Sequence, residues 1–293
     1  MLTNQTEEIN NINLQDYAQT IKHKAEEGDE FAMLKYGSYL CKGKYFETDV
    51  PKGIQYLKRA ADLGNPKAAR KYGIIFLLGF NVEINKEEAI KYIKISAEKD
   101  EPEGLFLYSI ILMRGDGVEK NEQVAVSYLK KAADLQHVES MYRYGMMTYK
   151  GTIVDKNIKE SARYLKMAAD KGHEDAIINY ALLMKSSENN EANVNESIHY
   201  FKILAEKDHP EAMYHLGMII FNREETEQKA EEGILLIKNA ANMGFAEAMY
   251  KYAAIKIHGM KCEKNIHEGA FYLHNAAQRG YPEALNALQE ILG

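Results

Sequence analysis

Apolar residues recur along this chain at helical spacing, in short segments separated by polar turns. The segment Met141–His173 shows the arrangement best. Its pattern predicts a first helix over Met141–Lys150, a turn at Gly151, a second helix over Asn157–Lys171 and a stop at Gly172. The elementary unit of the chain is therefore a pair of helices.

The same pattern returns every 36 residues in both directions. The dipeptide Tyr144-Gly145 recurs as Tyr36-Gly37 and Tyr72-Gly73 without an insertion. A fixed period of this size is the sequence signature of a solenoid. We therefore predict an all-α, right-handed α/α solenoid of seven 36-residue helix-pair repeats. Positions related by multiples of 36 residues are called a column below, named by its member in the first repeat.

The predicted array begins and ends on half a repeat. Residues 1–12 are expected to form a polar tail, and residues 13–29 a capping helix equivalent to the second helix of a pair. Seven repeats follow over residues 30–281, with first helices starting near residues 30, 66, 102, 138, 174, 210 and 246. Residues 282–293 form a last capping helix. Half-units at both ends are typical of capped solenoids.

Two columns indicate how the helices of a pair pack. The Gly37 column contains glycine, alanine or serine in all seven repeats. Glycine inside a helix costs about 1 kcal/mol relative to alanine, so its recurrence indicates close helix approach. We expect the matching small residues to be Ala60-Ala61 on the second helix. The tyrosines of the Tyr56 column are expected to provide the bulk of the core.

Helix ends carry recognisable capping residues. An Asn followed three residues later by Glu has the capping-box spacing, and this pair opens the second helix of four repeats. Gly64, Gly172, Gly244 and Gly280 are expected to close the second helices. The loop glycine of the Gly43 column is missing from repeats five and six, so we expect the softest loops there, at Ser186–Asn195 and Asn222–Glu232. The four capping boxes are Asn85/Glu88, Asn157/Glu160, Asn193/Glu196 and Asn265/Glu268.

These motifs together resemble the Sel1-like repeat family, α/α solenoids related to tetratricopeptide repeats. The resemblance covers residues 13–293 and implies a non-catalytic scaffold or adaptor that binds proteins. Family members include adaptors of ubiquitin-linked degradation at the endoplasmic reticulum, which is kept as an alternative function. The fourth repeat carries the family pattern at Tyr144, Gly145, Gly151, Asn157, Tyr164, Ala168, Ala169 and Gly172.

Charge and composition exclude several classes of function. The net charge is −6, with acids and bases interleaved, whereas nucleic-acid binding needs a concentrated basic face. The N-terminal residues lack the pattern of a signal peptide, and no apolar run is long enough to span a bilayer. Cys41 and Cys262 lie six periods apart, too far for a disulfide in a stacked array. We therefore expect a cytoplasmic protein; its oligomeric state is not predicted.

Residues that invite a metal or an enzyme hypothesis have simpler explanations. His137, His173 and His209 share one column, but equivalent positions of stacked repeats lie roughly 8–10 Å apart, too far to share a zinc ion. A second group fits no zinc signature, so we predict neither a metal nor a cofactor. That group is His258, Cys262, His267 and His274.

Two segments match S-x-x-K, a motif of penicillin-recognising serine enzymes: Ser96 to Lys99 and Ser127 to Lys130. The partner motifs S-D-N and K-T-G are absent from the chain. We predict that the protein is not an enzyme, and a β-lactamase-like hydrolase is kept as an alternative.

The remaining candidate is a surface. Positions 34, 38 and 41 share one face of the first helix, and by the resemblance this face lines the concave side. We predict that it binds a protein or peptide, with an acidic or C-terminal segment favoured by neighbouring basic residues. The competing interpretation is that column 34 packs only against the next repeat. The predicted groove comprises Phe106, Ile110, Met113, Tyr142, Met146, Tyr149, Tyr214, Met218, Phe221 and Tyr250, and its basic rim Lys35, Lys71, Arg114, Arg143, Lys150 and Lys251.

Overall fold

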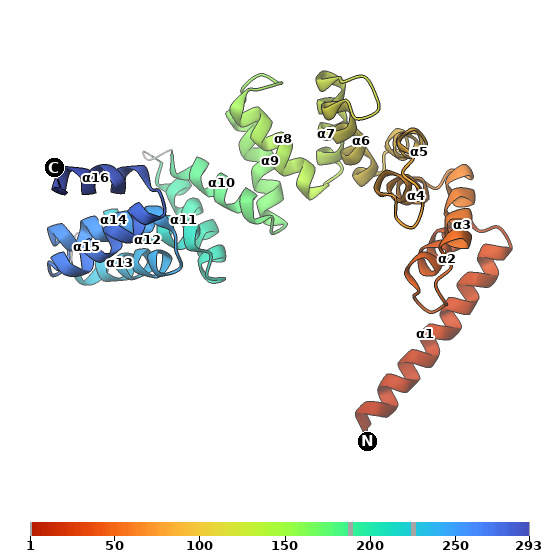
Figure 1. Ribbon diagram of the computed structural model, residues 1–293, viewed down its shortest axis with the longest axis horizontal. Coiled ribbons are helices and arrows are strands. Elements are labelled where there is room, and N and C mark those ends of the chain that lie inside the picture. Colours follow the sequence, from red (N-terminus) through yellow and green to blue (C-terminus); the bar gives the residue numbers. More distant parts are fainter. Residues whose placement is uncertain (1, 187–189, 224–226, 293) are drawn as a thin grey trace. The chain divides into compact units, whose positions relative to one another are not determined.

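The structure is a computed structural model. It describes the backbone of residues 2–186, 190–223 and 227–292, and the side chains of residues 14–186, 190–223 and 230–289. Within those residues there are 16 helices and no strands (Figure 1). From α1 to α8 and from α10 to α16, consecutive helices pack against each other. The predicted all-α class is confirmed.

The first helices begin where the 36-residue period places them. They are α2 (Glu30–Lys42), α4 (Pro66–Leu78), α6 (Pro102–Arg114), α8 (Val138–Lys150), α10 (Glu174–Lys185), α12 (Pro210–Arg223), α14 (Ala246–His258) and α16 (Pro282–Leu292). The helices that alternate with them are α1 (Leu2–Glu26), α3 (Val50–Asp62), α5 (Lys86–Glu98), α7 (Glu122–Asp134), α9 (Ile158–Asp170), α11 (Glu191–Ala205), α13 (Glu227–Asn242) and α15 (Ile266–Gln278).

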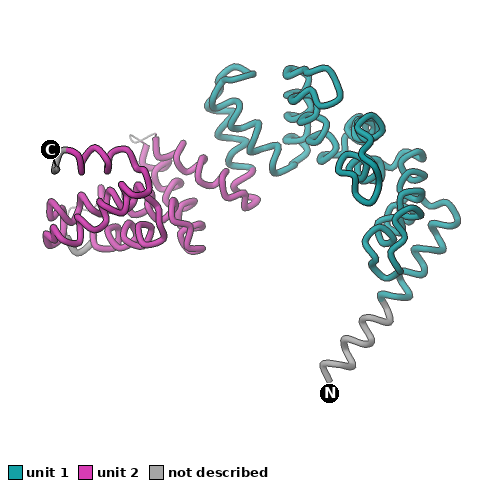
Figure 2. The backbone as a smooth tube through the Cα atoms, viewed as in Figure 1, with its two compact units in different colours: residues 1–167 teal, residues 168–293 magenta. Residues whose placement is uncertain are grey.

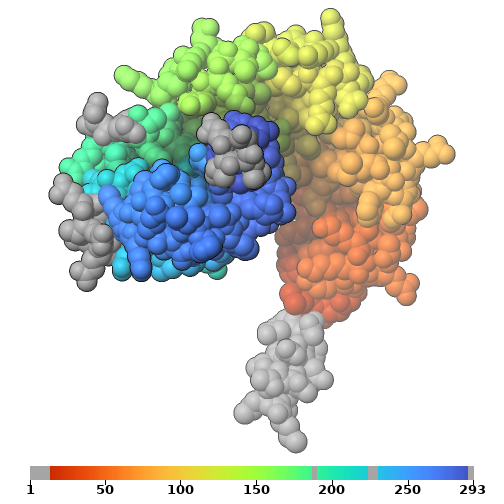
Figure 3. All heavy atoms as spheres, turned by 60° about the vertical axis from the view of Figure 1, so that its left-hand side comes forward, coloured from red at the N-terminus to blue at the C-terminus, as the bar shows by residue number. Residues whose placement is uncertain are grey.

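The chain divides into two compact units (Figure 2). Unit 1 comprises Met1–Met167 and unit 2 comprises Ala168–Gly293. Within unit 1, α3 contacts α4, α5 contacts α6, and α7 contacts α8, so neighbouring repeats are joined through second-to-first helix packing. The sequence-ordered colours of the space-filling view show the same neighbour-to-neighbour order within unit 1 (Figure 3).

The N-terminal helix differs from the prediction. It begins at Leu2 rather than at Asn13, so residues 2–12 continue α1 instead of forming a tail. No glycine or proline precedes Gly28 in this segment, so nothing in the local sequence ends the helix earlier.

Helix ends follow the predicted chemistry at most positions. Asn85, Asn157 and Asn265 each accept a hydrogen bond from the amide three residues on, which confirms these caps. The cap predicted at Asn193 is wrong, because Asn190 caps α11 and places Asn193 inside the helix. The loops expected to be softest lie partly outside the described residues, at 187–189 and 224–226. Gly64, Gly172, Gly244 and Gly280 have φ between 78° and 104°, as C-terminal stops require.

The carboxylates of the capping boxes have partners that the sequence reading missed. Glu88 accepts a hydrogen bond from the Tyr72 hydroxyl at 3.2 Å, and Glu268 accepts one from Tyr252 at 2.8 Å. Each bond runs from the first helix of a pair to the start of its second helix. The boxes therefore join the two helices of a repeat as well as capping one of them.

The close approach predicted at Gly37 exists, with a different partner. A Cβ atom added to Gly37 would lie 2.7 Å from the Gly53 carbonyl oxygen and 3.0 Å from Leu57 Cγ. Gly217 meets Gly233 in the same way, also at 2.7 Å. The matching small column therefore runs through Gly53, and the expected partner role of Ala60-Ala61 is wrong. Both alanines are buried in the core of unit 1.

Aromatic pairs occupy the centre of most repeats. A tyrosine of the first helix meets a tyrosine of the second edge to face, with centroids 4.9 Å apart for Tyr36 and Tyr56 and 4.8 Å apart for Tyr252 and Tyr272. Such T-shaped contacts stabilise a core beyond the area they bury. The core role predicted for the Tyr56 column is confirmed at its most buried members, Tyr92 and Tyr164.

Candidate partner-binding surface

Column 34 lies at the junction between repeats. Phe106 lies 4.8 Å, centroid to centroid, from His137, the residue that precedes α8. In unit 2, Tyr250 lies 5.4 Å from Tyr281, which stands in the same position before α16. Phe106 and Tyr250 therefore each pack onto the residue that precedes the next first helix. At these two positions the column contacts the next repeat, as the competing interpretation expects, while both side chains stay half-buried and partner binding by them remains a prediction.

Two residues of the predicted groove belong to the core of unit 2. Tyr214 is 7% exposed, and its hydroxyl donates a hydrogen bond of 2.9 Å to Glu247. Phe221 is also 7% exposed, with the Lys261 ammonium 4.9 Å from its ring centroid. The absence of a side chain on Gly233 lets α13 approach the Phe221 backbone closely. The prediction that these two side chains are accessible to a partner is wrong.

The predicted groove is more accessible in unit 1. Tyr149, in the last turn of α8, is 42% exposed. The other groove residues of this unit are half-buried: Phe106, Ile110, Met113, Tyr142 and Met146. In unit 2, Met218 and Tyr250 are half-buried as well. Partner binding by these residues stays a prediction.

The predicted basic rim divides into residues with intramolecular partners and exposed residues. Lys35 donates a hydrogen bond of 2.7 Å to the Tyr17 hydroxyl of α1. Arg143 pairs with Glu139, and its guanidinium lies 5.4 Å from the Phe106 ring centroid. Arg114 and Lys150 are exposed, whereas Lys251 is half-buried. Lys71 differs from all of these because it lines a pocket.

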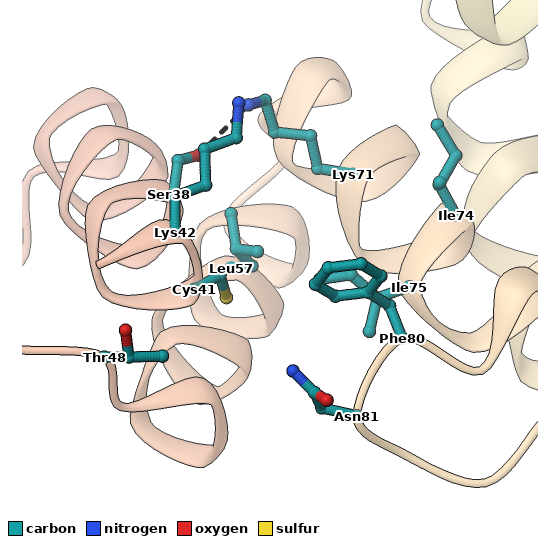
Figure 4. Close-up of a pocket in the computed structure, with 10 residues that line it drawn as sticks. All are labelled: Ser38, Cys41, Lys42, Thr48, Leu57, Lys71, Ile74, Ile75, Phe80 and Asn81. Carbon is teal, nitrogen blue, oxygen red and sulfur yellow. Dashed lines mark hydrogen bonds between the residues drawn. The ribbon is translucent and has the colours of Figure 1, made fainter. Parts of the chain in front are cut away.

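This pocket lies on the first-helix face of unit 1, between α2 and α4 (Figure 4). Its volume is about 500 Å³. Columns 38 and 41 contribute Ser38, Cys41 and Ile74, so the pocket lies on the face predicted to bind a partner. It is nevertheless in repeats one and two, from which the predicted groove took no residue. Its lining is Ser38, Cys41, Lys42, Thr48, Leu57, Lys71, Ile74, Ile75, Phe80 and Asn81.

The polar groups of the pocket lie together. Lys71 Nζ donates a hydrogen bond of 3.1 Å to Ser38 Oγ. Burial lowers the pKa of Lys71, and the positive charges of Lys42 and Arg70 lower it further. Burial raises the pKa of the Cys41 thiol, so this side chain contributes apolar surface rather than a nucleophile. The pocket therefore combines an apolar interior with two like charges.

The histidine column caps helices. His137 Nδ1 accepts a hydrogen bond of 3.3 Å from the Ser140 amide, and His173 Nδ1 accepts one of 3.2 Å from Ala176. The same position is occupied by a capping residue in each of the first three repeats, namely Asp29, Asn65 and Glu101. The sequence analysis did not predict these three caps. In the described part of the chain, no three His, Cys, Asp or Glu side chains are grouped to hold a metal ion.

The serines of the S-x-x-K segments lie in helices α5 and α7. The Ser127 hydroxyl donates a hydrogen bond of 2.7 Å to the Val124 carbonyl. Ser96 is completely buried, with its hydroxyl 3.5 Å from a carboxylate oxygen of Glu101. Both hydroxyls therefore have local structural partners.

Among the described residues, no helix has the length and hydropathy needed to cross a bilayer.

Comparison with known families identifies the repeats. The model of the Sel1 repeat matches residues 31–65, 66–101, 210–245 and 246–281. A model of plant tetratrico peptide repeats matches residues 118–207. No curated protein matches the chain.

Solved structures share the fold. A protective antigen of uropathogenic Escherichia coli with an SLR fold superposes with a TM-score of 0.74 at 20% identity, over 94% of this chain and 59% of its own. A Sel1 repeat protein from Oxalobacter formigenes superposes with a TM-score of 0.59 at 20% identity, over 95% of this chain and 80% of its own. The predicted α/α solenoid is therefore confirmed, and this chain spans less than two thirds of the first structure.

Proposed function

Because this chain belongs to the Sel1-like repeat family, we propose that it is a non-catalytic scaffold that binds a peptide or partner protein. Repeat proteins of the Sel1 and tetratricopeptide type generally act as protein-interaction scaffolds. The binding surface in this proposal is the first-helix face of unit 1. The pocket between α2 and α4 carries the proposal, because it is an apolar hollow on the face that the sequence pattern selects.

An exposed apolar loop beside the pocket supports this choice. Leu78 is 68% exposed, Phe80 60% and Ile84 62%, and Phe80 also lines the pocket. In repeats three and four of the same unit, these three columns contain only charged or polar residues: Arg114, Asp116 and Lys120, then Lys150, Thr152 and Lys156. Exposed apolar groups that cluster on a protein surface mark interaction sites.

The chemistry of the partner follows from the basic residues of this face. Lys42 and Lys71 at the pocket favour an acidic segment or a chain terminus with a free carboxylate, and Arg114 and Lys150 extend the positive charge along unit 1. Such charges act mostly through the rate of association. We place this scaffold in the cytoplasm, where the thiols of Cys41 and Cys262 remain reduced.

Site-specific photo-crosslinking tests the surface. A photoreactive phenylalanine is introduced at Leu78 or Tyr149 on the first-helix face, and at Lys159 on α9 as the control. Partners crosslinked in cells are identified by mass spectrometry, then purified and tested for direct binding. We expect one direct partner to crosslink at Leu78 and Tyr149 and not at Lys159. Crosslinking of direct partners at Lys159 alone contradicts the proposal.

A further inference from the structure

Small side chains open the pocket in the first repeat. Column 38 has Ser38 where the next three repeats have Ile74, Ile110 and Met146. Column 41 has Cys41 where those repeats have larger side chains, namely Leu77, Met113 and Tyr149. The hollow between α2 and α4 thus lies at positions where the other repeats of unit 1 have larger side chains.

Gly53 allows the floor of the pocket to lie deep. A Cβ atom at Gly53 would stand 2.5 Å from Cys41 Sγ, so α3 lies in close contact with this thiol. Leu57 of the same helix is 1% exposed and completes the floor. The pocket therefore depends on the small residues of repeat one, and repeat two supplies its other wall.

Two ammonium groups stand at one edge of this hollow. Figure 4 shows the Lys42 and Lys71 side chains reaching the same edge, beside Ser38, with Leu57, Ile75 and Phe80 beyond them. Lys71 donates to a hydroxyl, and among the described residues neither lysine forms an ion pair with a carboxylate. A bound carboxylate would offset the repulsion between the two charges.

We propose that this pocket anchors the C-terminal residue of a partner, with its apolar side chain in the hollow and its α-carboxylate on Lys42 and Lys71. The proposal rests on the scaffold function argued above. A C-terminal residue carries its side chain and its carboxylate on the same Cα atom, which matches a hollow that shares one edge with two ammonium groups. Thr48 and Asn81, across the pocket from the lysines, offer polar groups to the peptide backbone.

Peptide binding to the full chain tests the anchor. The probes are fluorescein-labelled octapeptides with acidic residues before a C-terminal Leu, Ile, Met or Phe, each made with a free carboxylate and as the amide. Fluorescence anisotropy should show at least one free-acid peptide binding roughly tenfold more tightly than its amide. Adding Gly-Ser-Gly after the apolar residue should weaken binding of the free-acid peptide as much as amidation does. Equal binding of acid, amide and extended forms, or no binding by any peptide, overturns the proposal.

Substitutions that introduce the residues of other repeats at equivalent positions test the site and are expected to preserve the fold. Ser38→Ile introduces the residue of repeats two and three, and Lys71→Leu the residue of repeat three. Each should weaken the free-acid peptide roughly tenfold without lowering the melting temperature. Ala254→Ile makes a similar change in the same column of unit 2 and should leave binding unchanged. Equal binding by Ser38→Ile and the wild type would refute the anchor.

Alkylation of Cys41 gives an independent measurement. In a Cys262→Ser chain, Cys41 is the one remaining cysteine. A saturating free-acid peptide should slow its reaction with iodoacetamide several-fold, and the amide peptide should not. An unchanged rate of Cys41 alkylation at a saturating concentration of the free-acid peptide contradicts binding in the pocket. If the anchor fails while crosslinks at Leu78 and Tyr149 persist, the scaffold function stands and only its ligand class is wrong.

Discussion

The hydroxyl of Tyr92 donates a hydrogen bond of 2.6 Å to the carboxylate of Asp62, thirty residues earlier in the chain. The bond joins α5 to the end of α3, so it connects the second helices of consecutive repeats. Tyr164 makes the same bond to Asp134 in unit 1, and Tyr200 makes it to Asp170 in unit 2. One column of tyrosines therefore both fills the core and links neighbouring repeats.

Removing this hydroxyl should weaken unit 1. Tyr92→Phe keeps the ring in the core and deletes the bond to Asp62, so we expect urea denaturation to show a loss of about 1 kcal/mol. Tyr128→Phe is the control, because the Tyr128 hydroxyl has no hydrogen bond to a described residue although its ring contacts Tyr108. Equal losses for the two variants would show that the hydroxyl bond contributes nothing.

The close contact between α2 and α3 should not tolerate a methyl group. In Gly37→Ala the new Cβ would lie 2.7 Å from the Gly53 carbonyl oxygen. Overpacking of this kind costs about 1–3 kcal/mol, which exceeds the roughly 1 kcal/mol gained in helix propensity. Urea denaturation should show a lower midpoint for Gly37→Ala than for the wild type. Ser127→Ala, on the exposed face of α7, should not lower it, and a stabilised Gly37→Ala would disprove the contact.

The stability of unit 2 should fall in mild acid because of His215. Burial, followed by the charge of Lys185, lowers the pKa of His215 to about 4, against about 6.5 in an unfolded chain. Between these values the unfolded state binds more protons, so stability is full above pH 6.5 and is lost as the pH falls toward 4. The loss should be about 1.4 kcal/mol per pH unit in this window.

Urea denaturation at pH 7.5 and pH 5.0 measures this effect. The Glu211 carboxylate, 3.9 Å from His215 Nε2, is the acidic group that could offset it. In His215→Leu, which introduces the residue of Leu107 in the same column, the difference between the two pH values should shrink by about 2 kcal/mol. An unchanged difference would show that another group causes the acid sensitivity.

The sequence predicted the fold well because its information is local and repeated. Helix starts, glycine stops and asparagine caps depend on a few neighbouring residues, and the repetition of the pattern makes single exceptions easy to recognise. Asn193 is an exception because Asn190, three residues earlier, offers an equally good cap. The partner of Gly37 was missed because the spacing within one helix does not reveal which turn of the next helix it meets.

The candidate site was harder to predict because exposure depends on contacts between repeats. Tyr214 and Phe221 have the same residue types as accessible groove positions, yet Glu247 and the approach of α13 bury them. The pocket left a signal in the sequence, namely small residues at Ser38 and Cys41 in columns that are otherwise bulky in unit 1. Finding this signal requires a comparison of side-chain size between equivalent positions of the repeats. The groove was predicted instead from aromatic and apolar residues, which were taken from repeats three to seven.

The most direct test of the account compares Tyr149→Ala with Phe221→Ala for binding of the crosslinked partner and for melting temperature. Tyr149→Ala should weaken binding at least roughly tenfold, about 1.4 kcal/mol, with nearly unchanged melting, because its ring is accessible. Phe221→Ala should lower the melting temperature markedly, since truncating a buried phenylalanine costs about 3–5 kcal/mol. Wild-type affinity in Tyr149→Ala, or unchanged melting in Phe221→Ala, would contradict this division between binding surface and core.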